Sequence, residues 1–362
     1  MKKVLIIANH YKNRSPGQRF RFEQYLNFLR ENGFECHLEN IITPKDDKYF
    51  YKPGNYLRKG WTIGKAILTR IQNIIQIEDY NLVLLFREAL PIGSTFIEKT
   101  LNQKGVKMIF DFDDAIWLQN VSNANRTFAF LKDAEKTSQL ISYCNMVFAG
   151  NQYLANYARQ FNQNVKIVPT TIDTQEYQRR EIEGKKGEIC IGWSGSITTI
   201  QHFEHALPAL KKIKQLFKDK VYFKVIGDGN YENEDIDLKG LPWQKDTELE
   251  DLSEIDIGIM PLPDDEWAKG KCGLKGLQYM ALEIATIMSP VGVNTEIIQH
   301  GLNGYLASTT EEWVHCLSQL VENADLRNKM GQAGRQTVVE KYSVEANKHL
   351  YLKYFNEVLE GR

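Results

Sequence analysis

The chain has 362 residues, of which 43% are hydrophobic and 25% are charged, and its formal net charge is −1. This composition is typical of a globular protein long enough for two domains of about 150–200 residues each. The balanced charge argues against a nucleic-acid-binding protein, and the five cysteines, which lack a CxxC or metal-ligand spacing, predict reduced thiols and no metal site.

The first half of the sequence alternates apolar runs with more polar segments, which predicts a doubly wound parallel sheet. Buried strands are expected at residues 4–8, 82–86, 106–112 and 146–149, and a helix after the first strand is expected to end near Gly33. The first apolar run is too short for a signal peptide or a membrane span. We therefore expect a cytoplasmic protein.

The expected loop at residues 9–18 leads into three arginines around a Pro-Gly turn. Arg14, Arg19 and Arg21 flank Gly17, so they could reach a diphosphate or an anionic acceptor. Arg19 is favoured because it lies nearest the glycine. The alternative is a helix start with solvated arginines, which explains any single one of them about as well.

Residues 48–77 contain several lysines and arginines and no acidic residue, interleaved with large apolar side chains. A basic amphipathic segment of this kind can lie on an anionic membrane surface. The same pattern fits a helix that packs on the first sheet and extends its basic side chains to solvent. The sequence leaves both interpretations open.

Three carboxylates, Asp111, Asp113 and Asp114, lie at the end of the expected strand 106–112. Clustered carboxylates can bind a divalent metal, accept hydroxyl groups or act as a base, and their repulsion raises at least one pKa. Metal binding is the less favoured option. The alternative has Asp114 cap the next helix and Asp111 pair with a buried arginine such as Arg87.

The second half repeats the alternation of strands and helices after a charged segment. Strands are expected at residues 189–193, 222–227, 255–260 and 286–289. The charged and strand-poor residues 174–188 are the best linker candidate. The predicted parts are an N-terminal domain at 1–173, a C-terminal domain at 174–342, and a C-terminal helix at 343–362 that packs on the first domain.

Two loops of the second half follow expected strands, where parallel sheets bind ligands. Gly195 and Ser196 offer backbone amides and a hydroxyl that can bind phosphate. The loop at 292–295 opens onto a helix, and its amides are further candidates. Trp243 could form a platform near a nucleobase, and it fits a core position equally well.

Two lysines, Lys271 and Lys275, lie at the start of an expected helix, where unpaired N–H groups and the helix dipole disfavour cations. A bound anion would resolve the conflict, and Gly273 would let the backbone approach a diphosphate. Gln278 falls on roughly the same stripe as the lysines. The less favoured alternative pairs both lysines with the acidic residues 264–266 in a solvated patch, which would not explain the glycines.

The run from Gly270 to Gln278, followed by a buried strand to Ser289, resembles the donor-site motif of retaining glycosyltransferases with the GT-B fold, in particular the large family 4. Family members carry a glutamate at each end of this run, where this chain has Gly270 and Gln278. The GKCG-x-K form is similar to that of a branch of the family in which the lysines carry the phosphates. Residues 170–173 resemble the segment where such chains leave the first domain.

The resemblance implies an α/β fold of two Rossmann-like domains facing a cleft, with a C-terminal helix that crosses back to the first domain. It implies transfer of a sugar from a nucleoside diphosphate sugar to a saccharide or lipid-linked acceptor, as in cell-surface polysaccharide synthesis, without a cofactor or a required metal. The expected catalytic residues are Asp113, Lys271 and Lys275, and the expected acceptor-binding residues are Arg21 and Asp114. The expected donor-binding residues are Gly17, Arg19, Gly195, Ser196, Trp243, Gly273, Leu274, Gln278, Val293, Asn294 and Thr295.

Three alternatives stay open. A nucleotide-sugar epimerase or hydrolase of the same fold would convert the donor without an added acceptor. A two-domain sugar-binding protein would close on its ligand without chemistry. Because both motif glutamates are replaced, a degenerate subunit that binds a sugar nucleotide without turnover also fits.

Overall fold

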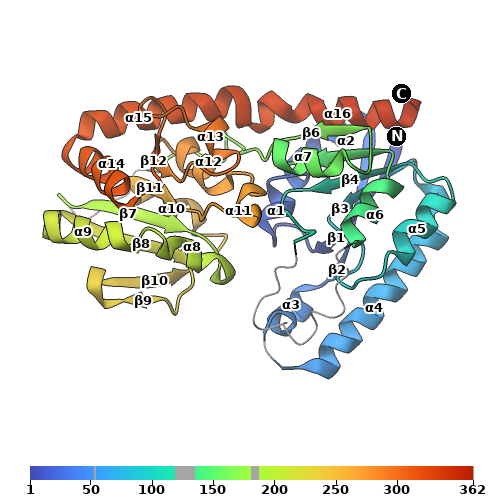
Figure 1. Cartoon of the computed structure of the whole chain (residues 1–362). Coiled ribbons are helices and arrows are strands. Elements are labelled where there is room, and N and C mark those ends of the chain that lie inside the picture. Colours follow the sequence, from blue (N-terminus) through green and yellow to red (C-terminus); the bar gives the residue numbers. More distant parts are fainter. Residues whose placement is uncertain (53, 119–134, 181–186, 362) are drawn as a thin grey trace. The chain divides into compact units, whose positions relative to one another are not determined.

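The computed structural model describes residues 1–52, 54–118, 135–180 and 187–361 (Figure 1). The chain divides into two compact units. The first consists of Met1–Thr170 together with Asn347–Arg362, and the second of Thr171–Ala346. Each unit is a mainly parallel sheet with helices on its faces, so the predicted α/β class is confirmed.

The first unit contains a six-stranded sheet in which all neighbouring strands are parallel. Its strands, in their order across the sheet, are β2 (Phe34–Ile42), β1 (Lys2–His10), β3 (Leu82–Phe86), β4 (Met108–Phe112), β5 (Met146–Ala149) and β6 (Val165–Ile167). The four strands predicted from apolar runs are all present. The edge strand β2 was not predicted, because its middle residues are only partly buried and its sequence is correspondingly polar.

The helices of the first unit connect these strands. They are α1 (Pro16–Arg19), α2 (Leu26–Glu31), α3 (Pro44–Phe50), α4 (Tyr56–Ile75), α5 (Phe96–Gln103), α6 (Lys136–Tyr143) and α7 (Gln152–Ala158), with the 3-10 helices η1 (Glu23–Tyr25) and η2 (Ile77–Asp79). The single helix predicted after the first strand is wrong, since α1, η1 and α2 replace it. Residues 18–23 are buried one after another, and consecutive buried side chains cannot all lie on one face of a regular helix.

The second unit contains a seven-stranded sheet that is parallel except for β9, which pairs antiparallel with β10. Its strands, in their order across the sheet, are β13 (Tyr305–Leu306), β12 (Ala285–Met288), β11 (Ile257–Met260), β7 (Ile189–Ser194), β8 (Val221–Gly227), β10 (Leu238–Pro242) and β9 (Glu232–Asn233). Its α-helices are α8 (Ile200–Glu204), α9 (Leu207–Phe217), α10 (Glu248–Ser253), α11 (Glu266–Lys269), α12 (Leu274–Ala281), α13 (Asn294–Ile297), α14 (Thr310–Glu322) and α15 (Ala324–Thr337). Shorter turns are η4 (Ile197–Thr199), η5 (Lys218–Lys220), η6 (Glu234–Ile236) and the π-helical η7 (Val338–Tyr342).

The C-terminal helix α16 (Val344–Glu360) completes the core of the first unit. Tyr351 stacks on Tyr25, with 4.4 Å between ring centroids, and Phe355 packs edge-on against Phe34 at 5.5 Å. Both helix residues are almost fully buried. The predicted return of the C-terminal helix to the first domain is therefore confirmed.

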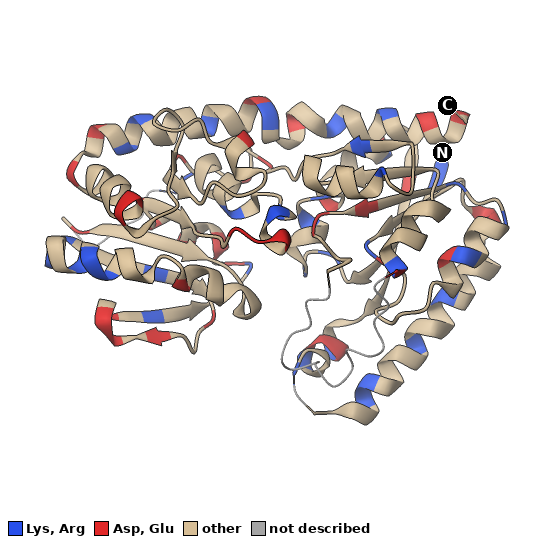
Figure 2. Ribbon diagram, viewed as in Figure 1, with Lys and Arg blue, Asp and Glu red and all other residues tan. Residues whose placement is uncertain are grey.

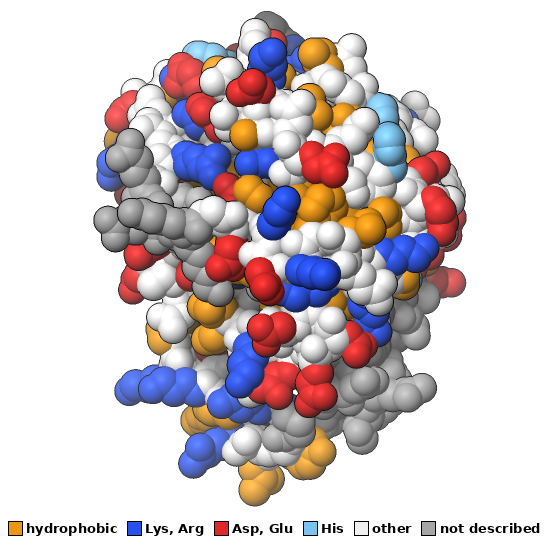
Figure 3. All heavy atoms as spheres, turned by 90° about the vertical axis from the view of Figure 1, so that its left-hand side faces the viewer, with side chains coloured by type: hydrophobic (Ala, Val, Ile, Leu, Met, Phe, Trp, Pro, Cys, Tyr) orange, Lys and Arg blue, Asp and Glu red, His pale blue; other side chains and the backbone are white. Residues whose placement is uncertain are grey.

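Charged side chains are spread over both units (Figure 2), and over most of the face shown in Figure 3 acidic and basic side chains are interspersed. Helix α4 departs from this pattern, because its basic residues Arg58, Lys59, Lys65 and Arg70 are not accompanied by any acidic residue. Among the described residues, no helix is both long and apolar enough to cross a membrane.

Candidate functional site

Two predicted site segments of the first unit and the segment that contains Arg87 come together because β1, β3 and β4 are parallel neighbours. The segments that follow these strands contain Gly17, Arg87 and Asp113, and they lie at the carboxyl edge of the sheet. A Cβ atom on Gly17 would lie 2.9 Å from Oδ2 of Asp113 and 3.3 Å from Nη2 of Arg87. A larger residue would have to displace the Asp113 carboxylate, so glycine lets the loop pack closely against it.

Arg87 holds the carboxylates of Asp113 and Asp114. Its Nε donates to Oδ1 of Asp113 at 2.8 Å, and its Nη2 donates to Oδ2 of Asp114 at 2.5 Å. Burial disfavours the charge of Arg87, but the two carboxylates outweigh burial and raise its pKa. Both aspartates are thus fixed as hydrogen-bond acceptors, with 12% and 18% of their side chains exposed.

Arg21 was predicted to bind the acceptor, and its burial rules this out. Its Nη2 lies 2.6 Å from Oδ1 of Asp111, and neither side chain is exposed. Tyr351 of α16 donates to the other oxygen of Asp111 at 3.3 Å, and a second guanidinium nitrogen donates to the carbonyl of Val168. The pair therefore links α16 to β4. The alternative that Asp111 pairs with a buried arginine is correct in kind, but the partner is Arg21 and not Arg87.

The other loop arginines differ in their surroundings. Arg19 is 7% exposed, and its guanidinium lies over the ring of Phe20 at 5.0 Å. Arg14 is more exposed and forms a two-point ion pair with Asp47, with contacts of 2.5 and 3.0 Å. Arg19 thus has little freedom to move toward a ligand.

Sequence reasoning missed His10, the last residue of β1. Its Nε2 lies 2.5 Å from the hydroxyl of Tyr51, and Gln18 binds its backbone. Burial, followed by the positive charge of Arg14, lowers the pKa of His10 to about 4. A neutral imidazole therefore lies at the same sheet edge as the aspartates. Its position at the end of the first strand was the signal that could have found it.

In the second unit, the two predicted lysines lie close together at the start of α12. Gly273 precedes the helix with φ +70°, a conformation that favours glycine, and a Cβ there would lie 2.4 Å from Cδ1 of Ile297. The ammonium of Lys275 lies 5.5 Å from the centroid of the Trp193 ring. Burial and the neighbouring Lys271 lower the pKa of Lys275 to about 8, against the opposing effect of Glu248.

The acidic residues 264–266, which the alternative pairs with both lysines, contact Lys269 and cap a helix. Asp264 and Glu266 lie 3.7 and 2.8 Å from the ammonium of Lys269, and Asp265 caps α11. Lys275 makes no hydrogen bond or ion pair with any residue that the structure describes. Its charge is thus offset only in part, by Glu248 and the ring of Trp193, and a cation of this kind at a helix start favours a bound anion.

Gln278 and Trp243 both donate hydrogen bonds to Glu248, a residue that was not predicted to belong to the site. The amide nitrogen of Gln278 donates to Glu248 at 3.3 Å and to the hydroxyl of Tyr177 at 3.1 Å. The Trp243 indole and the Tyr177 hydroxyl donate to the two oxygens of Glu248, at 3.0 and 2.9 Å. Glu248 is 7% exposed and Trp243 is half-buried, so Trp243 is not a core residue. No motif marks Glu248, because it lies at the start of an ordinary helix.

The loop at 292–295 packs beside the start of α12. A Cβ on Gly273 would lie 3.4 Å from a methyl of Val293 and 3.7 Å from Oδ1 of Asn294. Within the described structure, this buried Oδ1 has no hydrogen-bond partner, while the amide nitrogen donates to Ser289 at 3.0 Å. Thr295 is exposed. The structure therefore brings this loop, Gly273 and Leu274 together.

Gly195 and Ser196 lie directly after β7. A Cβ on Gly195 would overlap the ring of Trp193, so the glycine accommodates the indole under Lys275. The amide of Ser196 donates to Oγ1 of Thr199 at 2.9 Å. This amide is occupied in a capping turn, and the exposed hydroxyls of the turn are the groups that face solvent.

Comparisons with known proteins agree with this architecture. Residues 174–337 match the model of the family described as glycosyl transferases group 1. This segment contains Lys271, Lys275 and the Glu248 cluster, and the match supports glycosyl transfer. No curated protein matches the chain.

Among solved structures, sucrose-phosphate synthase from Thermosynechococcus elongatus aligns over 100% of both chains with a TM-score of 0.74 and 11% identity. A glycosyltransferase from Rickettsia africae aligns over 100% of this chain and 99% of its own with a TM-score of 0.67 and 12% identity. Anabaena Alr3699/HepE in complex with UDP-glucose aligns over 99% of this chain and 100% of its own, with a TM-score of 0.69 and 11% identity. These likenesses confirm the GT-B fold.

Proposed function

We propose that the chain is a retaining glycosyltransferase that transfers a sugar from a nucleoside diphosphate sugar to a saccharide or lipid-linked acceptor without a required metal. The observation that carries the proposal is the pair Lys271 and Lys275 at the start of α12, where Lys275 lacks any described anionic contact and has a lowered pKa. The match to glycosyl transferases group 1 covers both lysines. Cell-surface polysaccharide or glycoconjugate synthesis on the cytoplasmic side is the process we propose.

A diphosphate fits this helix start better than other anions. It carries enough negative charge for two ammonium groups, and the first-turn N–H groups of α12 can donate to its oxygens. The fold neighbour HepE is described in complex with UDP and with UDP-glucose, which makes uridine nucleotides the first to test here.

The same groups explain how the donor bond would break. As the bond between the anomeric carbon and the phosphate oxygen lengthens, negative charge grows on the leaving diphosphate. Lys271, Lys275 and the helix dipole stabilise that charge. The acceptor hydroxyl attacks the same face of the sugar and gives its proton to the departing phosphate oxygen, so the configuration is retained. In the first unit, the carboxylate of Asp113, held by Arg87, is available to accept hydrogen bonds from sugar hydroxyl groups.

The Glu248 cluster supplies the nucleoside part of this proposal. The amide nitrogen of Gln278 is committed to Tyr177 and Glu248, so its carbonyl oxygen is the atom left for a ribose hydroxyl. The indole of Trp243 is fixed by Glu248, and its half-buried ring can stack on a nucleobase.

Thermal stabilisation by UDP, GDP, ADP, dTDP, CMP and their sugars, with and without EDTA, tests the proposal. We expect one nucleotide class to raise the melting temperature in the presence of EDTA. Lys271→Ala and Lys275→Ala should each remove most of this shift, while Lys212→Ala, at an exposed lysine paired with Glu311, should not. The absence of any shift would refute the proposal. Donor turnover without added acceptor would indicate an epimerase or hydrolase.

A further inference from the structure

Helix α4 exposes a row of large apolar side chains and buries several polar ones. Leu57, Trp61, Leu68 and Ile75 are 92%, 70%, 64% and 72% exposed. Their spacing of four and seven residues places them on one stripe of the helix. Ile71, at 40% exposure, lies on the same stripe. The stripe is thus a continuous row of large apolar groups in solvent.

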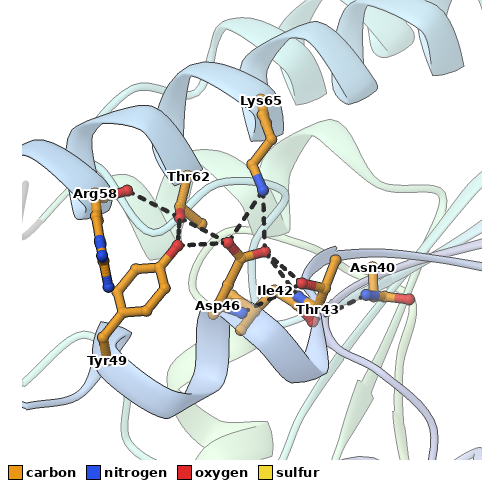
Figure 4. Close-up of polar contacts among 8 residues, drawn as sticks. All are labelled: Asn40, Ile42, Thr43, Asp46, Tyr49, Arg58, Thr62 and Lys65. Carbon is orange, nitrogen blue, oxygen red and sulfur yellow. Dashed lines mark hydrogen bonds and ion pairs between the residues drawn. The ribbon is translucent and has the colours of Figure 1, made fainter.

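The opposite side of α4 is buried and largely polar. Thr62 donates to Oδ1 of Asp46 at 3.1 Å and lies 3.0 Å from the hydroxyl of Tyr49. Lys65 forms an ion pair with the same carboxylate at 3.0 Å (Figure 4). The capping box of α3 and the helix α4 therefore share one buried carboxylate, Asp46, which is 2% exposed.

Arg70 fixes the second half of α4. It is fully buried, and its guanidinium donates to the backbone carbonyls of Ala8, Glu39 and Ala89 at 2.8, 3.0 and 2.9 Å. Rotation of the helix would break these three hydrogen bonds and leave the buried guanidinium without them, which is costly. The apolar stripe is held outward by the contacts of the polar face.

The charges beside the stripe favour an anionic surface. Arg58 on α4, together with Lys48 and Lys52 before it, is exposed. The sequence from residue 48 to 77 contains no acidic residue, and Asp46 and Asp47 are already paired with Lys65 and Arg14. A large apolar row with uncompensated cations beside it is the pattern of a helix that lies in a membrane interface.

A second copy of the chain fits this face poorly. Two α4 helices joined along their stripes would bring basic flanks together, and neither helix has an acidic residue for an interhelical ion pair. We infer that the apolar stripe of α4 inserts into the interface of an anionic phospholipid membrane. This inference does not depend on Lys271, Lys275 or the Glu248 cluster, which belong to the other unit.

Flotation with vesicles tests the inference. The full chain should float with vesicles of phosphatidylcholine and phosphatidylglycerol at about 3:1 and much less with phosphatidylcholine alone. The variant Leu57→Gln/Trp61→Gln/Leu68→Gln should bind the anionic vesicles at least about tenfold more weakly. Because these side chains are exposed, its melting temperature should match that of the wild type.

Two matched variants separate the apolar and charge contributions. Leu216→Gln, at another exposed leucine, should bind like the wild type. Lys52→Gln/Arg58→Gln should reduce the preference for anionic vesicles. Equal flotation of the wild type and the triple variant would overturn the inference. So would failure of the wild type to float, or a wild-type dimer that the triple variant converts to a monomer.

Discussion

Lys275 should make nucleotide binding weaken as the pH rises. Its pKa in the unliganded protein is about 8, whereas a bound diphosphate should restore a value near the ordinary 10.5. Because this pKa is lowered, Lys275 of the free protein loses its proton above pH 8. At pH 9 its amine must therefore take up a proton when the nucleotide binds. With this pKa, about 90% of the side chains are charged at pH 7 and about 10% at pH 9.

The expected loss of affinity between pH 7 and pH 9 is therefore about tenfold, or about 1.4 kcal/mol. Titration calorimetry at constant ionic strength, with the nucleotide selected by thermal stabilisation, measures it. At pH 8, buffers of different ionisation enthalpy should reveal the uptake of about half a proton per nucleotide.

The variant Lys275→Met is the control, because it removes the titrating group while keeping much of the side-chain volume. Its affinity should be lower than that of the wild type at pH 7 and nearly constant up to pH 9. An exposed-lysine variant, Lys212→Met, should keep the wild-type pH dependence. If Lys275→Met binds as tightly as the wild type, or if wild-type affinity is the same at both pH values, Lys275 does not contact the phosphates.

Other substitutions test separate parts of the structure. Asp111→Asn should lower the free energy of unfolding by about 3–5 kcal/mol in urea denaturation, because it leaves a buried guanidinium uncompensated, and a loss below about 1 kcal/mol would contradict this. Gly17→Ala should cost about 1–3 kcal/mol in the same assay, since the new methyl would lie 2.9 Å from Asp113, and unchanged stability would be inconsistent with that close packing. Glu248→Gln should shift the pH profile of nucleotide binding to lower pH, because its charge favours protonated Lys275, and an unchanged midpoint would remove Glu248 from the site.

The sequence predicted the parts of the fold that depend on continuous apolar runs. The central strands β3, β4 and β5 are completely buried, so their sequences carry an unbroken apolar signal. The edge strand β2 is partly exposed along its middle residues. Its sequence there, ECHLEN, mixes polar and apolar residues, so it lacks an apolar run. The strands that the sequence did not predict lie mainly at the edges of the sheets. The predicted central strands were therefore enough to assign the α/β fold class.

The candidate site was predictable only in part, because the sequence does not show which polar side chains are buried or which distant residues contact them. Lys271 and Lys275 conflict with a helix start, and that conflict is visible in the sequence. Arg21 and Asp111 are 90 positions apart, so nothing local shows that they form a buried pair. The contacts of Glu248 are likewise long-range, since Tyr177 is 71 positions away.

The position of α16 has a consequence for biosynthesis. Residues 347–362 belong to the first unit, although the ribosome makes them after the whole second unit. Until they emerge, Tyr25 and Phe34 lack the aromatic partners that cover them, and Asp111 lacks the hydroxyl of Tyr351. The N-terminal unit is therefore finished last, and its nascent form leaves Tyr25 and Phe34 without their aromatic partners during translation of the second unit. A truncated chain that stops at Thr170 would retain this unfinished surface, so an expressed N-terminal unit needs the terminal helix supplied as a fusion.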